Sequence, residues 1–343
     1  IDPLGSTRNN LGPVRTEARF PGVEMDVGHY ESFYLKASAP EGGRAVWIRH
    51  TAHKRPNQEP TCAVWMTYFD ATSGSPRAAK QQFGAERLGT PAGSYMRVDD
   101  SEIGPGYARG AVSAGDVHGA WTLRFNDRHE VLKHLPSEWM YRRSLPRTKL
   151  LSPHPGASFD GVLRIGKERV EISDWPGMVG HNWGAEHAEQ WVWIQATAPE
   201  RAASDDYIDV GAGRIRVGRL TTPWIANGAI VLSGERHPLG GIGRTYSTEV
   251  APTPTGCRFS FSGTGISVHG TVGAPAEQFV GFLYSDPSGG SHHALNCSIS
   301  DLELRVERPD HEHVQLRSER GAVYELGTHD TGHGIPIQPY EDG

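Results

Sequence analysis

The stretch Ala45-Val46-Trp47-Ile48-Arg49-His50 decides the fold class, because its residues separate into two alternating sets. Successive side chains of a β-strand point to opposite faces, so Val46 and Ile48 would share one face. Trp47 and Arg49 would share the other face. A shift of one residue in strand register would exchange the two faces, so the sequence predicts two distinct faces without saying which one points inward.

The same alternation recurs along most of the chain, with turn signals between the segments. The sequence is also rich in the turn formers glycine (42 residues) and proline (24 residues). Many short strands joined by turns are typical of barrels and sandwiches, so we predict an all-β fold. One segment, 76–88, has a weakly helical pattern. Further strands are expected at 62–69, 121–125, 162–165, 170–172, 259–261, 266–268, 279–284, 302–306 and 323–326.

Length and charge limit the class of protein. A chain of 343 residues can form two domains of ordinary size, and we place them at 1–185 and 186–343. The net charge of −6 is unlike the basic footprint of a nucleic-acid-binding protein. No apolar run reaches the roughly 20 residues that a transmembrane helix requires. The expected partner is therefore a small molecule, and neither nucleic acid nor a transmembrane segment is expected.

The cysteines indicate a reducing environment. Cys62, Cys257 and Cys297 are few, far apart and odd in number, which does not suit a disulfide framework. They are expected to be small buried residues. The first residues also lack a basic and apolar signal region. We therefore expect a cytoplasmic protein.

A dense group of chemically active residues occurs in Gly180-His181-Asn182-Trp183-Gly184-Ala185-Glu186-His187, followed by Trp191-Val192-Trp193-Ile194-Gln195. Tryptophan and histidine each combine an apolar body with a polar group that needs a partner. Such a group predicts a pocket with aromatic walls and a proton donor at one point. Because it lies near the expected domain junction, where ligand sites are common, a functional role is favoured.

These residues resemble a known family. The Gly180–Gly184 turn and the Trp-x-Trp strand at Trp191–Trp193 are similar to the central signature of a two-domain, lipocalin- or calycin-like group. That group includes hydroxyneurosporene synthase (carotenoid 1,2-hydratase), the tocopherol cyclases and lipocalin-like Diels–Alderases. The stretches 29–34 and 293–299 resemble its opening and a part of its second domain. The resemblance implies two lipocalin-like β domains packed together, with a hydrophobic cavity near their junction.

The resemblance also implies a reaction. Members of the group hydrate, cyclise or simply bind isoprenoid-like molecules, so we expect a hydratase or cyclase that works by acid catalysis without a cofactor. Where characterised members have an aspartate near the central turn, this chain has Asn182. The acid would then be His181, Glu186 or a residue from elsewhere. Burial among aromatic side chains would raise the pKa of a carboxyl group and suit it to this role.

Other side chains are candidates for contact with the substrate. Tryptophan faces would stabilise a carbocation through cation–π contacts. Trp191 and Trp193 share a strand face, and either line the pocket or fill the barrel. Arg49 beside Trp47 either orients the ligand or forms a structural ion pair. The candidate substrate-binding residues are Trp47, Arg49, Trp65, Trp183, His187, Trp191, Trp193 and Gln195.

A metal or redox mechanism is not expected. Histidines gather in the segments 292–293, 310–313 and 329–333, but the His-Glu-x-x-His pattern of zinc proteases does not occur. Dinucleotide and nucleophile-elbow motifs are also missing from the sequence. We therefore expect no cofactor and no metal. Two other functions remain open: a carrier that binds a hydrophobic ligand unchanged, and a structural or partner-binding β protein with a filled interior.

Overall fold

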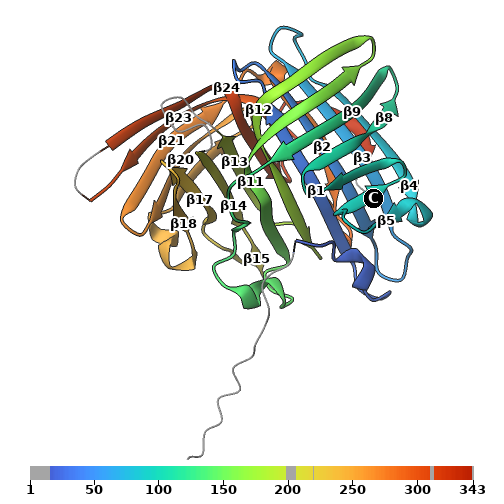
Figure 1. Ribbon diagram of the computed structural model, residues 1–343. Coiled ribbons are helices and arrows are strands. Elements are labelled where there is room, and N and C mark those ends of the chain that lie inside the picture. The colour runs from blue at the N-terminus through green and yellow to red at the C-terminus, as the bar shows by residue number, and fades with distance from the viewer. Residues whose placement is uncertain (1–15, 198–205, 219, 310–312, 342–343) are drawn as a thin grey trace, which may run out of the picture.

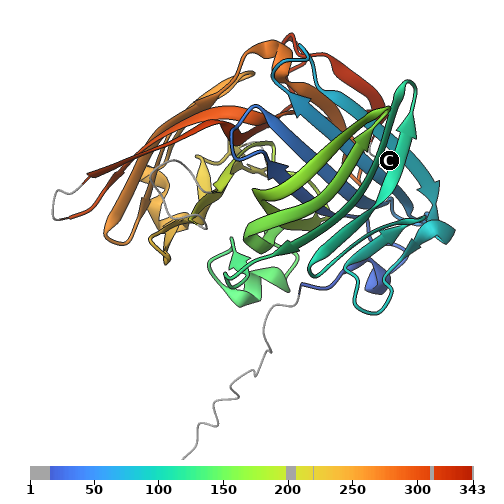
Figure 2. The same cartoon turned by 45° about the horizontal axis from the view of Figure 1, so that its top comes forward.

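The described part of the protein contains two large β-sheets, each curved around its own interior, and one small two-stranded sheet (Figures 1 and 2). This computed structural model describes residues 16–197, 206–218, 220–309 and 313–341. In these ranges each helix is a short 3-10 turn. Both large sheets are closed or nearly closed barrels, which confirms the all-β prediction.

The first barrel lies on the right in Figure 1 and is built from the amino-terminal half of the described chain. Its strands follow the order β4-β3-β2-β1-β12-β11-β9-β8-β7-β6-β5, and β10 pairs with β11. The strands are β1 (His29–Ser38), β2 (Arg44–Lys54), β3 (Thr61–Asp70), β4 (Arg77–Gly84), β5 (Leu88–Gly89), β6 (Met96–Val98), β7 (Ser101–Gly104), β8 (Tyr107–Ala114), β9 (Val117–Asn126), β10 (Leu132–Lys133), β11 (Thr148–Ile165) and β12 (Glu168–Gly184).

The second barrel closes because β21 pairs with both β20 and β23. The path from β20 through β18, β17, β14, β13, β24, β23 and β21 thereby returns to β20. Its strands are β13 (Gln190–Thr197), β14 (Tyr207–Arg214), β17 (Ile225–Leu232), β18 (Glu235–Gly240), β19 (Glu249–Thr253), β20 (Gly256–Gly263), β21 (Ile266–Gly273), β22 (Val280–Ser285), β23 (Ser291–Glu307), β24 (His313–Thr328) and β25 (Ile337–Glu341), with a separate pair β15 (Arg216–Val217) and β16 (Leu220–Thr221).

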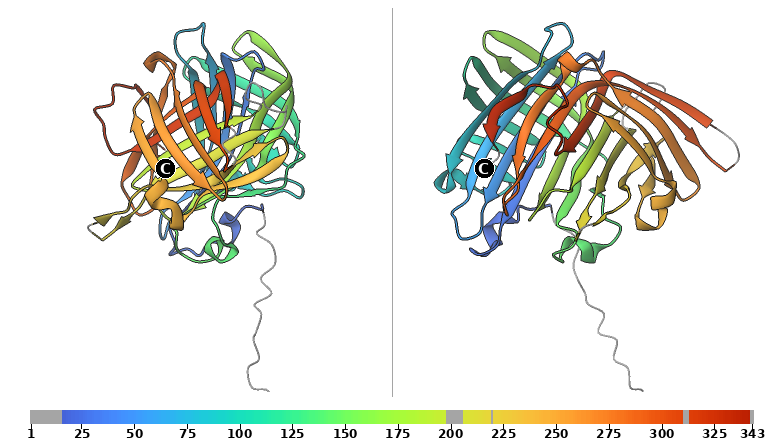
Figure 3. Two further views of the ribbon diagram at one scale, coloured as in Figure 1. Left: turned by 90° about the vertical axis from the view of Figure 1, so that its left-hand side faces the viewer. Right: turned by 180° about the vertical axis from the view of Figure 1, so that it is seen from behind.

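The chain passes from the first sheet to the second between Gly184 and Gln190. The division into domains at 1–185 and 186–343 stays a prediction. Seen from behind, the orange strands of the second barrel lie across the blue strands of the first (Figure 3). The residues of the passage therefore lie close to the contact between the barrels.

Strands β2 and β3 present one face to each barrel. Val46 and Ile48 lie in the core of the first barrel, whereas Trp47 and Trp65 belong to the core of the second. The predicted alternation is thus confirmed, and both faces of these strands are buried. Burial of both faces explains the unbroken apolar runs 45–48 of β2 and 62–66 of β3.

The helical interpretation of 76–88 is wrong. Most of this segment forms β4, which pairs with β3, and a single 3-10 turn (Ala85–Arg87) follows it. Ala78 packs in the core of the second barrel, and Ala79 packs in that of the first. Pairing with β3 and burial of both faces outweigh the modest helix preference of alanine, as tertiary context often does.

The state of the cysteines is the one expected from the sequence. Cys62, Cys257 and Cys297 are buried and free, as predicted. In the described part of the chain, we find no helix with the length and apolar character needed to cross a membrane.

Candidate functional site

His181 lies inside the first barrel, on the inward face of β12. Its side chain is fully buried, and its Nε2 lies 2.7 Å from Oε1 of Glu31 on the neighbouring strand β1. The imidazole is held between two aromatic rings, with centroid distances of 3.8 Å to Phe33 and 4.5 Å to Trp183. These contacts fix the orientation of the ring, and the Nδ1 atom has no hydrogen-bond partner.

Glu31 is the polar centre of this end of the barrel. Besides His181, it receives hydrogen bonds from the backbone N–H groups of Arg19 (2.8 Å) and Phe20 (2.7 Å), and His29 Nε2 lies 3.4 Å away. Burial acts to raise the pKa of Glu31, but the hydrogen bonds with His181 and His29 outweigh it and lower this pKa to about 2. The carboxylate is therefore anionic at neutral pH.

The protonation of His181 follows from the same environment. Burial lowers the pKa of His181 below its ordinary value, although Glu31 acts in the opposite direction. The imidazole is then neutral at neutral pH and donates its Nε2 proton to the anionic carboxylate. Nδ1 carries the lone pair, which makes this atom the one that can take up and release a proton.

The segment 16–28 covers this end of the barrel and is held in place by the protein. Lys54 Nζ donates hydrogen bonds to the carbonyl oxygens of Glu24 (2.8 Å), Met25 (2.7 Å) and Val27 (2.8 Å). The Glu31 carboxylate holds the same segment through the backbone bonds described above. We call residues 16–28 the strap.

Glu186 does not share the environment of His181. Its carboxylate forms an ion pair with Arg147 at the surface, and its side chain is 37% exposed. The burial among tryptophans expected from the sequence is therefore not found. Its catalytic role remains a prediction, in competition with that of Glu31.

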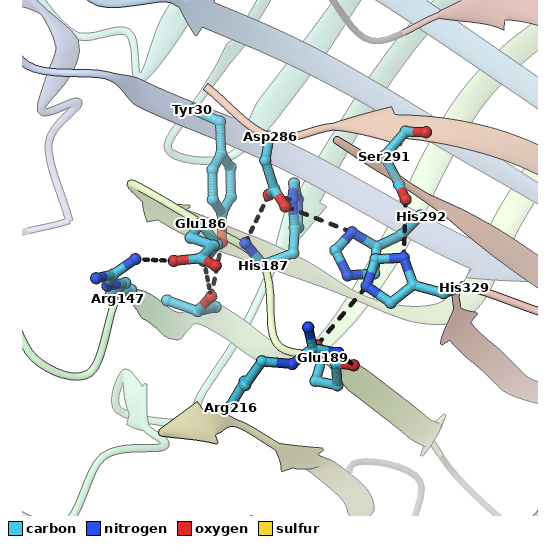
Figure 4. Close-up of polar contacts among 11 residues, drawn as sticks. Tyr30, Arg147, Glu186, His187, Glu189, Arg216, Asp286, Ser291, His292 and His329 are labelled. Atoms are coloured by element: carbon cyan, nitrogen blue, oxygen red, sulfur yellow. Dashed lines mark hydrogen bonds and ion pairs between the residues drawn. The ribbon is translucent and has the colours of Figure 1, made fainter. Parts of the chain in front are cut away.

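A second group of polar side chains lies at the contact between the barrels (Figure 4). Asp286 Oδ1 accepts a hydrogen bond from the backbone N–H of His187 at 2.8 Å. The same oxygen lies 2.7 Å from Nδ1 of the His187 ring. His292 Nδ1 is 3.6 Å from the other carboxylate oxygen. The ring of His187 stacks on Tyr30 at 4.0 Å and on Trp191 at 5.5 Å.

The charges in this second group differ between its members. Burial acts to raise the pKa of Asp286, but hydrogen bonding to His187 outweighs it and lowers this pKa. Burial and the neighbouring His187 and His329 lower the pKa of His292 to about 4. At neutral pH the group thus contains an anionic carboxylate and a neutral His292 imidazole.

A hollow opens beside this group. His329, whose ring lies 3.9 Å from that of His292, forms part of its wall, and the volume of the hollow is about 250 Å³. The lining is largely polar, unlike the apolar cavity expected from the sequence. It is formed by Glu189, Gln190, Arg214, Thr221, Thr328, His329 and Asp330.

The two tryptophans of β13 are anchored by buried carboxylates. Trp191 Nε1 donates to Glu325 Oε1 at 2.9 Å, and Trp193 Nε1 donates to Asp209 Oδ1 at 3.0 Å. Ser152, on β11 of the first barrel, also donates to Asp209. The two indole bonds thus hold strands of the second barrel together, and Trp193 shares Asp209 with the bond from Ser152 that links the barrels.

Three other predicted residues pack between the barrels. Trp47 and Trp65 each lie 5.5 Å from the ring of Phe282. The guanidinium of Arg49 lies 4.2 Å from the centroid of Tyr284 and 5.6 Å from that of Trp65. Because all these side chains are buried, this part of the junction is filled by protein atoms.

The structure therefore divides the predicted site into separate groups. His181 and Trp183 are brought together inside the first barrel, whereas His187 and Trp191 lie at the contact between the barrels. Gln195 Nε2 donates a hydrogen bond to the hydroxyl group of Thr197 on the same strand. Two carboxylates were not proposed as site residues from the sequence, because Glu31 and Asp286 reach their histidines only across long stretches of sequence. His292, which was not proposed as a site residue either, lies beside Asp286.

Comparison with known proteins supports the fold. No protein-family model matches the chain. Two uncharacterized proteins of Mycobacterium tuberculosis, Rv0493c (strain H37Rv) and MT0513 (strain CDC 1551), are each 26% identical over 181 residues. The match covers 52% of this chain and 52% of each relative, so the chain spans about half the length of the curated relatives it matches.

Two solved structures are similar over most of the chain. A protein assigned as AttH from Nitrosomonas europaea has a TM-score of 0.57 at 14% identity, over 93% of this chain and 99% of that one. Kievitone hydratase from Nectria haematococca has a TM-score of 0.50 at 10% identity, over 88% and 89%. The fold is shared with both. It fits the lipocalin-like architecture implied by the resemblance, while kinship with hydroxyneurosporene synthase and the tocopherol cyclases remains a prediction.

Proposed function

We propose that the protein is a hydratase or cyclase that acts on a hydrophobic, isoprenoid-like olefin, with His181 as the acid–base residue. One observation carries the proposal: His181 is fully buried, is bonded through Nε2 to the Glu31 carboxylate at 2.7 Å, and has an unpartnered Nδ1 between aromatic rings. An imidazole oriented by a carboxylate is a common arrangement for general acid–base catalysis. The likeness to kievitone hydratase supports the hydratase reaction by analogy.

The chemistry needs only a proton that moves to the substrate and back. Protonated His181 gives its Nδ1 proton to one alkene carbon, and the other carbon becomes a carbocation. The anionic Glu31 stabilises the imidazolium beforehand, and the faces of Phe33 and Trp183 stabilise the carbocation. Water then adds and returns a proton to Nδ1, which gives the hydratase product. Attack by a second double bond, followed by proton loss, gives the cyclase product.

Entry of the substrate requires movement of the strap. His181 is fully buried, and the strap backbone is bonded to Glu31, the same residue that orients the imidazole. Opening the strap would uncover the aromatic rings on either side of His181. The mobile part of the mechanism is therefore a surface segment, and the barrel that holds the histidine stays rigid.

A panel of olefinic isoprenoids, incubated with the purified protein and examined by mass spectrometry, tests the proposal. A product heavier by one water supports hydration, and an isomer of unchanged mass supports cyclisation. His181→Gln keeps an N–H group directed at Glu31 but removes Nδ1, so it should abolish turnover and leave the protein folded. His118→Gln, at an exposed histidine of β9, is the matched control.

Two outcomes would overturn the proposal. Full activity of His181→Gln would exclude His181 as the acid–base residue. Recovery of a bound isoprenoid without any conversion would identify a carrier. Glu186→Gln, compared with Glu31→Gln, decides between the two carboxyl groups, because only the bond to His181 predicts a large loss for Glu31.

A further inference from the structure

The junction between the barrels carries a group of side chains that the proposed chemistry at His181 does not use. His187, Asp286 and His292 each offer one ligand atom, and these atoms lie within 4.8 Å of one another. All three residues are buried. We propose that they form a binding site for a divalent transition-metal ion such as Zn²⁺. The sequence led us to expect no metal, because it lacks the His-Glu-x-x-His pattern, and His187 is 99 residues from Asp286 in sequence.

The spacing of the donor atoms fits such an ion. Ligand atoms about 2.1 Å from a tetrahedral zinc ion lie roughly 3.4 Å from one another. The distance from Asp286 Oδ1 to His187 Nδ1 is 2.7 Å, and that from Asp286 Oδ2 to His292 Nδ1 is 3.6 Å. Adjustments of about 1 Å, which side-chain rotation can supply, would place all three around one ion. The metal would replace the proton shared by His187 and Asp286.

The unused hydrogen-bonding atoms point to a ligand. Among the described residues, neither ring nitrogen of His292 makes a hydrogen bond of good geometry, and besides the Asp286 carboxylate the ring interacts with the backbone of Ala188. His292 is only 2% exposed, so water does not satisfy its ring from the surface. Buried polar atoms without partners are costly, and each such atom in a native protein calls for an explanation. A metal ion between His187 Nδ1 and His292 Nδ1 would give the His292 ring the strong partner that it lacks.

Two of the three residues are held by regular structure. Asp286 follows β22 directly, where its backbone N–H donates to Gly290 O and its carbonyl oxygen accepts from Gly289 N–H. His292 lies in β23 and pairs with Tyr284 in β22. Asp286 and His292 are therefore fixed on either side of the turn of one hairpin. His187 joins them from the segment that connects the two barrels.

The surroundings would support metal binding. The backbone N–H of His187 orients the Asp286 carboxylate, as outer hydrogen bonds commonly do in metal sites. His329 packs on His292 and is itself held by Ser291 O at 3.0 Å. Three protein ligands leave a fourth position for water, and the hollow lined by His329 provides solvent close by. Figure 4 shows His329 beside His292.

The donor set selects the class of ion. Two imidazole nitrogens and one carboxylate oxygen suit Zn²⁺, Co²⁺ or Ni²⁺. Ca²⁺ and Mg²⁺ prefer shells composed of oxygen atoms. The ion would tie the segment between the barrels to the β22–β23 hairpin of the second barrel. It would lie against Tyr30, whose neighbour Glu31 faces the interior of the first barrel.

Titration of the chelator-treated full-length chain with Co²⁺ tests the site through its visible absorption spectrum. We expect one Co²⁺ per chain, an absorption typical of nitrogen and oxygen ligands, displacement by Zn²⁺ and a higher Tm. Asp286→Asn and His292→Ala should each weaken binding at least tenfold. His293→Ala is the matched control, because His293 bonds to His333 outside the site. Its affinity should be unchanged.

Other outcomes would overturn the inference. They are the lack of stoichiometric Co²⁺ binding, equal affinity for Mg²⁺, or loss of binding in His293→Ala with retention in His292→Ala.

Proton–nitrogen NMR of the unaltered chain provides a measurement that does not depend on the folding of variants. Zn²⁺ should shift the ring nitrogen signals of His187 and His292, and unchanged signals would exclude the site. None of these measurements depends on turnover, so the proposed function is tested separately.

Discussion

Glu31 and His181 are 150 residues apart in sequence, and Glu31 Oε1 lies 2.7 Å from His181 Nε2. Antiparallel pairing of β1 with β12 creates this contact, since Phe33 is opposite His181 and Trp183 is opposite Glu31. The two aromatic residues that enclose the imidazole are therefore fixed by the same register. A shift of one residue would turn His181 out of the barrel and break every one of these contacts.

Glu31→Gln should reduce kcat/KM by a factor of about 10² to 10⁴, the usual contribution of an oriented acid–base residue. The amide keeps the shape of the side chain but removes the charge that stabilises the His181 imidazolium. Kinetics with the substrate found in the isoprenoid panel measure the effect. Glu186→Gln should retain activity close to wild type, because its ion pair with Arg147 is exposed. The reverse order of the two variants would make Glu186 the catalytic carboxyl group.

The rate of the reaction should depend on pH through the protonation of His181, which must carry a proton to act as the acid. Its pKa is lowered by burial, so the imidazolium is populated only at pH values below the ordinary histidine range. The rate should therefore fall as pH rises through the lowered pKa. In Glu31→Gln the supporting anion is lost, and this fall in rate should move to still lower pH. A rate that increases with pH would instead show His181 acting as a base.

Folding must be followed at each pH of that profile. The pKa of Glu31 is lowered to about 2 in the folded protein, and that of an unfolded glutamate is about 4.3. The stability contributed by the Glu31 anion is thus present above about pH 4.3 and is lost as pH falls toward 2. Circular dichroism separates this unfolding from the titration of His181.

A buried lysine gives a prediction about stability. Lys36, on β1, donates a hydrogen bond to Gly321 O of the second barrel at 2.5 Å, and burial lowers its pKa to about 7. An unfolded lysine has a pKa of about 10.4, so between pH 7 and 10.4 the unfolded chain binds more protons. Stability of the wild type should therefore rise with pH across this window.

Lys36→Met should raise Tm at pH 7 and remove this part of the pH dependence, because methionine fills similar space without a charge to desolvate. Ser38 Oγ, at 3.3 Å, still donates to Gly321 O. Calorimetry at pH 7 and pH 10 measures both effects. A lower Tm with an unchanged pH slope would show that the Lys36 hydrogen bond outweighs the desolvation of the ammonium group.

The sequence predicted strand faces well and side-chain partners poorly. Alternation at Val46 and Trp47 is a local property, and the two barrel cores confirm it. By contrast, the environment of Glu186 depends on Arg147, and that of His181 on Glu31, through strand pairs that no local pattern encodes. The β-rich composition predicted barrels, whereas the exact register determined which histidine received a carboxylate.

The partners of the predicted site residues were also not evident from the local sequence. Trp193 was expected to line or fill a barrel, and its position is set by the Asp209 carboxylate in the adjacent strand β14. His292 and His293 are neighbours in sequence but point to different partners, because side chains alternate along β23. His292 faces Asp286, whereas His293 bonds to His333 at 2.8 Å. The histidine segments 292–293 and 329–333 therefore meet as two separate pairs, His292 with His329 and His293 with His333.

Gly327→Ala should destabilise the contact between the barrels, because a Cβ atom there would lie 2.1 Å from the indole of Trp191. The ring would have to move, which would break its bond to Glu325 and its stacking on His187. Overpacking costs about 1–3 kcal/mol, and the loss of the donor to a buried carboxylate adds a similar amount. Urea unfolding followed by tryptophan fluorescence measures both the loss of stability and the displaced ring.

Gly243→Ala is the control, since nothing lies within 4 Å of its Cβ position, and it should change stability by less than about 0.5 kcal/mol. Equal stability of the two variants would show that Trp191 has room to move and that its anchoring by Glu325 contributes little.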